Sequence, residues 1–382
     1  MAYFRNNTVN LLNLHYGLHS FAASGSGAFF GVFLLKAGVP APVVLLSIAG
    51  ILLGRFLIRP SVLIFAKRFG VKPLLIAGTI VTSLQYPLLA DVDGIGVGLF
   101  VVCAASAIGD TFYWTNYHAY FAALGDAEHR GHQVGAREAV AAVVGVIGPL
   151  ATGWSLTALG PRIAFGAAAA VMMLAALPIV WTPNVAVPQE TSGTLRTAMP
   201  GILLFAADAF IAGSYVFVWQ IALFLSLGES FSAFGGAMAL AAFAGAVGGL
   251  LLGRLVDAGH GTRVAIVALV TMVASTMLQA VSVGNAPLAV LANASGALVA
   301  CLHVPVLGTA IYNQAKRSPC TLRFHIATEA GWDLGGASAL LVAAGLLHAG
   351  VPIGTCLLLS LLGTLASFYL LRTYFSTLEP AA

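Results

Sequence analysis

The chain has 382 residues, of which 59% are hydrophobic and 8% are charged, and its formal net charge is +4. Soluble domains carry about 25% charged residues, so this composition excludes a water-soluble protein and predicts one that spans a bilayer. The basic residues lie in turns between apolar runs, where they set membrane orientation, and we expect no nucleic-acid partner. The four cysteines form no CxxC pair, so neither a disulfide framework nor a thiolate metal site is predicted.

Twelve apolar runs follow one another along the chain. A helix needs about 20 residues to cross the ~30 Å hydrocarbon core of a bilayer, and the runs are close to or above that length. The first run keeps Asn and His side chains among its apolar residues, so we expect it to span the membrane and not to be a cleaved signal. The sequence thus predicts an all-α membrane protein. The runs cover residues 11–36, 41–65, 72–90, 94–124, 134–160, 162–182, 197–227, 231–256, 262–283, 286–315, 322–348 and 351–375.

One long polar interval, residues 182–197, separates the sixth run from the seventh. We therefore predict an N-terminal six-helix bundle over 1–182, a linker over 183–196 and a C-terminal six-helix bundle over 197–382. With the N-terminus inside, twelve Lys and Arg residues face the cytoplasm and only Lys36 and Arg162 face outward. Basic loops stay inside, which predicts cytoplasmic termini and a cytoplasmic linker in a multi-pass protein of the cell inner membrane, expected to be a monomer.

The two halves of the chain repeat one another. Residues 109–154 and 301–339 carry similar residues in the same order, with Tyr120 placed 18 residues before Glu138 and Tyr312 placed 17 before Glu329. Shorter matches join ILLGR at 51–55 to LLLGR at 250–254, and FAAS at 21–24 to FAAD at 205–208. Repeated halves of membrane helices with ionisable residues inside them are typical of transporters with a site near the bilayer midplane.

This organisation resembles the major facilitator superfamily. The turn after the eighth run, residues 253–263, is similar to the gating-loop motif of that family, with Gly253, Asp257 and Arg263 on matching residue types. The corresponding turn of the first half has Lys67 where the family usually has Asp. The resemblance implies two six-helix bundles that move a small solute by alternating access, with the first, fourth, seventh and tenth helices lining a central cavity.

A second motif of the family is partly present in the fifth run. Residues 148–153, GPLATG, resemble the glycine-proline motif of exporters, with Thr152 in place of a glycine. The motif points to export, but the direction of transport stays open on the sequence alone.

Acidic residues inside the runs are the main candidates for coupling. Asp110 and Asp208 lie in the fourth and seventh runs, where a charged carboxylate is costly and a carboxyl that binds a proton can couple a proton to a solute. Glu329 and Asp333 are four residues apart, hence on one helix face, and form a candidate proton or cation site. We predict proton coupling through these four acids. In the other interpretation, basic partners such as Arg55, Arg59 or His303 neutralise the aspartates and fix helix packing.

Basic residues at the helix mouths are the candidates for gating. Arg55 and Arg59 of the second run are expected to tune or gate the site. Arg137 and Glu138 stand near the cytoplasmic mouth, where Glu138 is expected to be a first-turn acid that pairs across the interface between the halves.

Histidines and aromatic residues leave a second substrate class open. His15, His19, His118 and His303 could bind a transition metal or a metal chelate, although no His/Cys cluster supports it, and no resident metal or cofactor is predicted. Asn313 is a candidate hydrogen-bonding residue. A stacking wall for a flat ligand is predicted from Tyr113, Trp114, Tyr117, Tyr215, Trp219 and Trp332.

Enzyme signatures are missing from the sequence. HExxH, GxSxG, P-loop and dinucleotide-binding patterns do not occur, so we predict no enzymatic activity. A sensor or scaffold that uses a transporter fold remains an alternative, because a fold does not dictate function. The preferred prediction is a secondary transporter for a small solute, coupled to protons.

Overall fold

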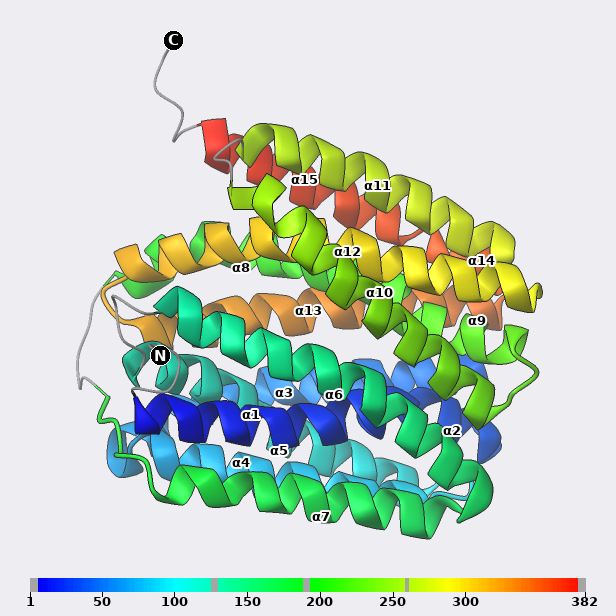
Figure 1. Ribbon diagram of the computed structural model, residues 1–382, viewed down its shortest axis with the longest axis horizontal. Coiled ribbons are helices and arrows are strands. Elements are labelled where there is room, and N and C mark those ends of the chain that lie inside the picture. The colour runs from blue at the N-terminus through cyan, green and yellow to red at the C-terminus, as the bar shows by residue number, and fades with distance from the viewer. Residues whose placement is uncertain (1–5, 125–129, 188–192, 258–260, 377–382) are drawn as a thin grey trace.

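The computed structural model describes residues 6–124, 130–187, 193–257 and 261–376, without the side chains of residues 122, 130–136, 252–257 and 261–264. Every regular element in these ranges is helical (Figure 1). The first half contains α1 (Asn7–Gly25), α2 (Phe30–Lys36), α3 (Ala41–Phe69), α4 (Val71–Ala90), α5 (Val97–Leu124), α6 (Arg130–Ala158) and α7 (Pro161–Val180). The second contains α8 (Thr194–Ala212), α9 (Trp219–Ser226), α10 (Phe231–Asp257), α11 (Gly261–Ser282), α12 (Ala286–Arg317), α13 (Thr321–His348), α14 (Ile353–Leu357) and α15 (Ser360–Ser376).

Twelve membrane spans arise from these helices in the described part of the chain. α1 and α2 join into the first span through a 3-10 turn at Gly27–Phe29, and α8 and α9 join into the seventh through a π-helical segment at Gly213–Val218. α14 and α15 make the last. The twelve predicted runs and the predicted all-α class are confirmed, and no boundary differs by more than four residues, as at 11 against Asn7.

Short turns with fixed backbone geometry separate the spans. Gly70 and Gly160 both have a φ of 83°. This left-handed region disfavours any residue with a Cβ, so glycine ends one helix and lets the chain reverse. Pro161 then opens α7 at a position where a helix needs no backbone N–H.

Helices from the two halves of the sequence pack directly on one another. α3 lies against α13, and α6 lies against α10. α1 begins, α7 ends, α8 begins and α15 ends at one end of the bundle, which we call the linker end; the opposite end is the far end (Figure 1). These contacts connect the halves without defining their limits, so the domain boundaries at 182 and 197 stay predictions.

Glycines allow the closest of these contacts. A Cβ on Gly153 of α6 would lie 2.6 Å from the carbonyl oxygen of Phe231 in α10, and one on Gly335 of α13 would collide with the carbonyl oxygen of Ala206 in α8. Small residues let helices approach in lipid, where packing and not the hydrophobic effect drives association.

The internal repeat is partly structural. Glu138 and Glu329 are both the ninth residue of their helices, α6 and α13, so these positions correspond. The matched segments ILLGR and LLLGR do not lie at corresponding positions, so the prediction from that match is wrong. Arg55 lies in the middle of α3, whereas Arg254 is three residues before the end of α10, so five similar letters fall at different depths of the bundle.

Candidate functional site

A cavity of about 330 Å³ lies between the middle of the bundle and its far end. α1, α3, α4 and α5 form most of its wall, while the π-helical segment, α9 and α13 border it from the second half. The residues of its wall that bear on function are polar or aromatic. They are His19, Arg55, Thr82, Asp110, Trp114 and Trp332.

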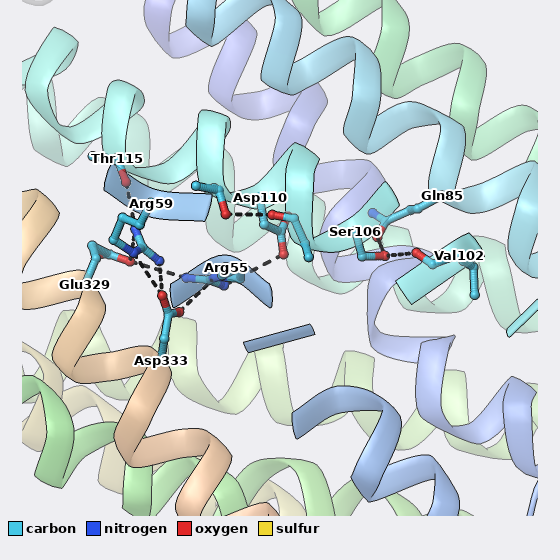
Figure 2. Close-up of polar contacts among 11 residues, drawn as sticks. Arg55, Arg59, Gln85, Val102, Ser106, Asp110, Thr115, Glu329 and Asp333 are labelled. Carbon is cyan, nitrogen blue, oxygen red and sulfur yellow. Dashed lines mark hydrogen bonds and ion pairs between the residues drawn. The ribbon is translucent and has the colours of Figure 1, made fainter. Parts of the chain in front are cut away.

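Arg55 connects the cavity to a buried charge network. Its Nη1 lies 3.8 Å from Oδ2 of Asp110 in α5, and its Nη2 lies 3.3 Å from Oε2 of Glu329 in α13. Its Nε forms a third ion pair, at 2.9 Å, with Oδ1 of Asp333. Figure 2 shows this guanidinium between acids of both halves. Arg55 therefore links α3 and α5 to α13.

Arg59 holds the same two α13 acids from one turn further along α3. Its Nε donates to Oδ2 of Asp333 at 2.9 Å, its Nη2 donates to the same oxygen, and its Nη1 lies 3.8 Å from Glu329. Nη1 also donates to the hydroxyl of Thr115 in α5 at 2.7 Å. Both arginines and both α13 acids are buried, and Asp333 is 0% exposed.

Helical periodicity explains why these residues meet. Positions four apart share a helix face, and three such columns point to one another in the interior. Arg55 and Arg59 form the column on α3, and Glu329 and Asp333 form the one on α13. The column on α5 consists of Asp110, Trp114 and His118.

Two residues beside the charge network, Thr115 and His325, were not predicted from the sequence. His325 lies one turn before Glu329 on α13, is buried, and stacks on His118 with ring centroids 5.7 Å apart. The spacing of four residues from Glu329 was a signal for it. With His325, the polar column of α13 extends from the cavity side toward the linker end.

Asp208 was expected to share a chamber with Asp110, but the structure separates them. Asp208 of α8 pairs with Nε2 of His303 in α12 at 3.0 Å, and neither residue is on the cavity wall. Tyr215 and Trp219 are buried in the second half, against Ser275 at 2.7 Å and Asn293 at 3.0 Å. The side chains of these helices satisfy one another inside the second half, which keeps them from the cavity.

The predicted stacking wall is divided in the same way. Trp114 and Trp332 line the cavity, whereas Tyr113 and Tyr117 are buried in a cluster with His15 and His19. Asn313 is half-buried on α12 and lies on neither the wall of this cavity nor that of a second one beside α3.

The histidines considered for a metal do not gather in one place. His15 contacts the carbonyl oxygen of Ala175 at 2.6 Å, His19 stacks on Tyr113, and His118 stacks on His325. No group of three His, Cys, Asp or Glu side chains able to hold a metal ion occurs in the residues that the structure describes.

The sequence matches one known protein family over most of its length. Residues 12–319 match the family described as Major Facilitator Superfamily. The chain belongs to the Major Facilitator Superfamily. A comparison with curated protein sequences finds no match. The family places the chain among secondary transporters and not among enzymes, as predicted.

Solved structures of transporters share the fold. The crystal structure of the human organic anion transporter MFSD10 (TETRAN) has a TM-score of 0.72 at 14% identity, covering 96% of this chain and 99% of that one. The POT family transporter PepTSo has a TM-score of 0.66 at 12% identity, with coverage of 98% and 99%. An auto-inhibited POT family peptide transporter has a TM-score of 0.66 at 14% identity, with 98% of each chain covered. At these identities the likeness concerns the fold alone.

The superfamily motifs fall on different parts of the structure. Gly253, Asp257 and Arg263, predicted for gating, lie in helix segments whose side chains the structure does not describe. Gly148 and Pro149 lie where α6 packs on α1 and α10, since a Cβ on Gly148 would lie 3.0 Å from the carbonyl oxygen of Phe21. This motif is thus part of a helix contact in the Major Facilitator fold.

The prediction for Glu138 is wrong. α6 begins at Arg130, so Glu138 lies in the third turn and not the first, beyond the reach of the helix N-terminus. Its ion pair among the described residues is with its neighbour Arg137, at 2.5 Å, and not with a residue of the second half, and its side chain is 56% exposed. Arg137 also stacks over the rings of Tyr16 and Phe121 at 5.1 Å and hydrogen-bonds the side chain of Tyr312 in α12, so it contacts both halves.

Proposed function

We propose that this protein is a secondary active transporter that couples the movement of a small solute to protons. Its two halves, residues 1–182 and 197–382, rock around the cavity. The protein lies in the inner membrane of the cell, with both termini and the linker 183–196 on the cytoplasmic side. The observation that supports coupling is the charge balance of the buried network. Two arginines face three acids across the contact of α3 and α5 with α13.

The network carries one negative charge in excess when all five groups are ionised. Uncompensated charge is expensive in a buried site, and one proton or one cationic group cancels it. Asp110 is the acid best placed to receive either, because its side chain is 26% exposed while those of Glu329 and Asp333 are 9% and 0% exposed. A proton and a solute can therefore compete for, or share, the same carboxylate.

Occupation of Asp110 bears on the contact between the halves. Arg55 divides its three ion pairs between Asp110 in the first half and two acids of α13 in the second. When Asp110 is neutralised, the guanidinium keeps its ion pairs with the two acids of α13 alone. The protonation state of one carboxyl thus alters the balance of forces across the interface, as alternating access requires.

The test is solute-driven proton movement in proteoliposomes. Vesicles with a pH-sensitive dye inside receive a panel of amines, carboxylates, sugars and peptides, and the internal pH is followed after each addition. Asp110→Asn should abolish the pH response. Asp91→Asn removes an equally charged but exposed acid, 63% exposed and paired with Arg162, and should respond as wild type does.

Two results would count against the proposal. Proton-coupled uptake by Asp110→Asn at the wild-type rate would remove Asp110 from the mechanism. Absence of both proton movement and counterflow with the whole panel would favour the sensor or scaffold instead.

A further inference from the structure

The cavity is of a size that suits a small organic molecule. Ligand pockets in proteins enclose about 300–1,000 Å³, and a volume of about 330 Å³ stands at the lower end of that range. Part of the wall is flat and apolar, since Trp114, Trp332, Phe30 and Phe217 all border it. The volume and the wall of the cavity therefore suit a small solute with an aromatic or aliphatic body.

The charges at the wall favour a cation over an anion. Arg55 is the only guanidinium among the described residues of the wall, and each of its three nitrogens already faces an acid. Its face also lies over the ring of Trp332, 5.6 Å from the centroid. An anionic solute would have to displace one of these acids, whereas a cation would add a partner to the network.

Asp110 is the acid that such a cation would meet. Its distance of 3.8 Å to Arg55 is longer than the 3.3 Å and 2.9 Å at which Glu329 and Asp333 approach the same guanidinium. It is also the only one of the three acids on the wall of the cavity. An ammonium group beside Asp110 would bring the net charge of the network to zero.

Buried polar atoms of wall residues also lack a hydrogen-bond partner among the described residues. Examples are Nδ1 of His19 and the hydroxyl of Thr82, and both residues are 2% exposed. Buried polar groups are nearly always satisfied, so these atoms favour a ligand that supplies hydrogen bonds. His19 and Asp110 are on different helices, so they define separate anchoring points.

From this arrangement we infer that the cavity binds a small monovalent organic amine. The ammonium group pairs with Asp110, the apolar body packs against Trp114 and Trp332, and a hydroxyl or similar group of the amine bonds to Thr82 or His19. The role of the amine as a transported solute rests on the proposed function. Binding of the amine needs neither a proton gradient nor movement of the halves.

Binding is tested by titration calorimetry on the purified protein in detergent micelles at pH 7, with three probes of similar shape. Phenylethylamine is the cation, 2-phenylethanol its neutral analogue and phenylacetate the anion. We expect the amine to bind at least tenfold more tightly than the alcohol, because a charge-assisted hydrogen bond to a partly buried carboxylate is strong. The anion should bind most weakly. Equal or tighter binding of phenylacetate would overturn the inference.

Two substitutions locate the amine. Asp110→Asn should reduce the affinity for phenylethylamine to that for 2-phenylethanol, while Asp91→Asn should leave it unchanged. For Thr82→Val, the probe is 2-amino-1-phenylethanol, whose additional hydroxyl should improve binding several-fold in wild type and not in the variant. Because the alcohol reports on a folded cavity in every variant, loss of amine binding alone identifies loss of the ionic contact.

The outcomes separate this inference from the transport proposal. Amine binding that depends on Asp110, without proton movement in vesicles, would support the ligand class and refute coupling. Proton-coupled transport of another solute, with no calorimetric signal for the amine, would support coupling and refute the ligand class.

Discussion

Arg59→Met is the substitution for which the structure gives the clearest consequence. Arg59 is 1% exposed, donates to Asp333 through Nε and Nη2, and holds Thr115 through Nη1. Methionine fills much of the space of the arginine stem but supplies no charge. The network then has one arginine for three acids, and its excess rises from one negative charge to two. Removing one partner from a buried ion pair costs about 3–5 kcal/mol, and we expect a loss of that size.

The double variant Arg59→Met/Asp333→Leu separates charge from packing. It restores the excess of one negative charge, and buried ion pairs replaced by apolar residues of similar volume are often neutral in stability. We therefore expect it to recover most of the loss. Unfolding free energies would be measured by tryptophan fluorescence in mixed micelles with increasing SDS. Arg59→Met within about 1 kcal/mol of wild type, or a double variant as unstable as the single one, would refute the charge-balance reasoning.

Two further predictions concern packing and the surface. Gly335→Ala should lower the melting temperature clearly, because its Cβ would collide with the carbonyl oxygen of Ala206 and overpacking costs about 1–3 kcal/mol. Gly345→Ala in the same helix has open space and should be neutral or stabilising by up to about 1 kcal/mol, so equal melting of the two variants would contradict the proposed fit of α8 on α13. Lys36→Met removes an exposed ion pair with Glu229 at 3.3 Å and should change the free energy of unfolding by less than about 1 kcal/mol. A larger change in the same melting assay would indicate that this ion pair holds the two halves together.

The spans and the fold class could be predicted because hydropathy and length are local properties. A run such as 322–348 must be helical in a bilayer, where every backbone group needs an internal partner. The candidate acids followed from the same reasoning, since Asp110, Glu329 and Asp333 are anomalies within apolar sequence. Their depth in the bundle was therefore accessible without coordinates.

The partners of these acids were not accessible, because pairing depends on how distant helices pack. The sequence named Arg55, Arg59 and His303 as alternative partners, and nothing local chose among them. Arg59 and Asp333 are 274 residues apart, and only the contact of α3 with α13 brings them together. The ILLGR match failed for the opposite reason: a local likeness of Leu-rich sequence carried no information on depth in the bundle.

Breaks in the first and seventh spans affect how the cavity can open. A continuous α-helix resists bending because each turn is bonded to the next, and irregular segments are where membrane helices flex. The 3-10 turn at Gly27–Phe29 and the π-helical segment at Gly213–Val218 both contribute residues to the cavity wall, Gly27 and Phe217. Each of these spans thus consists of two α-helices joined by an irregular segment beside the cavity. Movement of α2 or α9 about these segments would change the cavity wall without separating the arginines of α3 from the acids of α13.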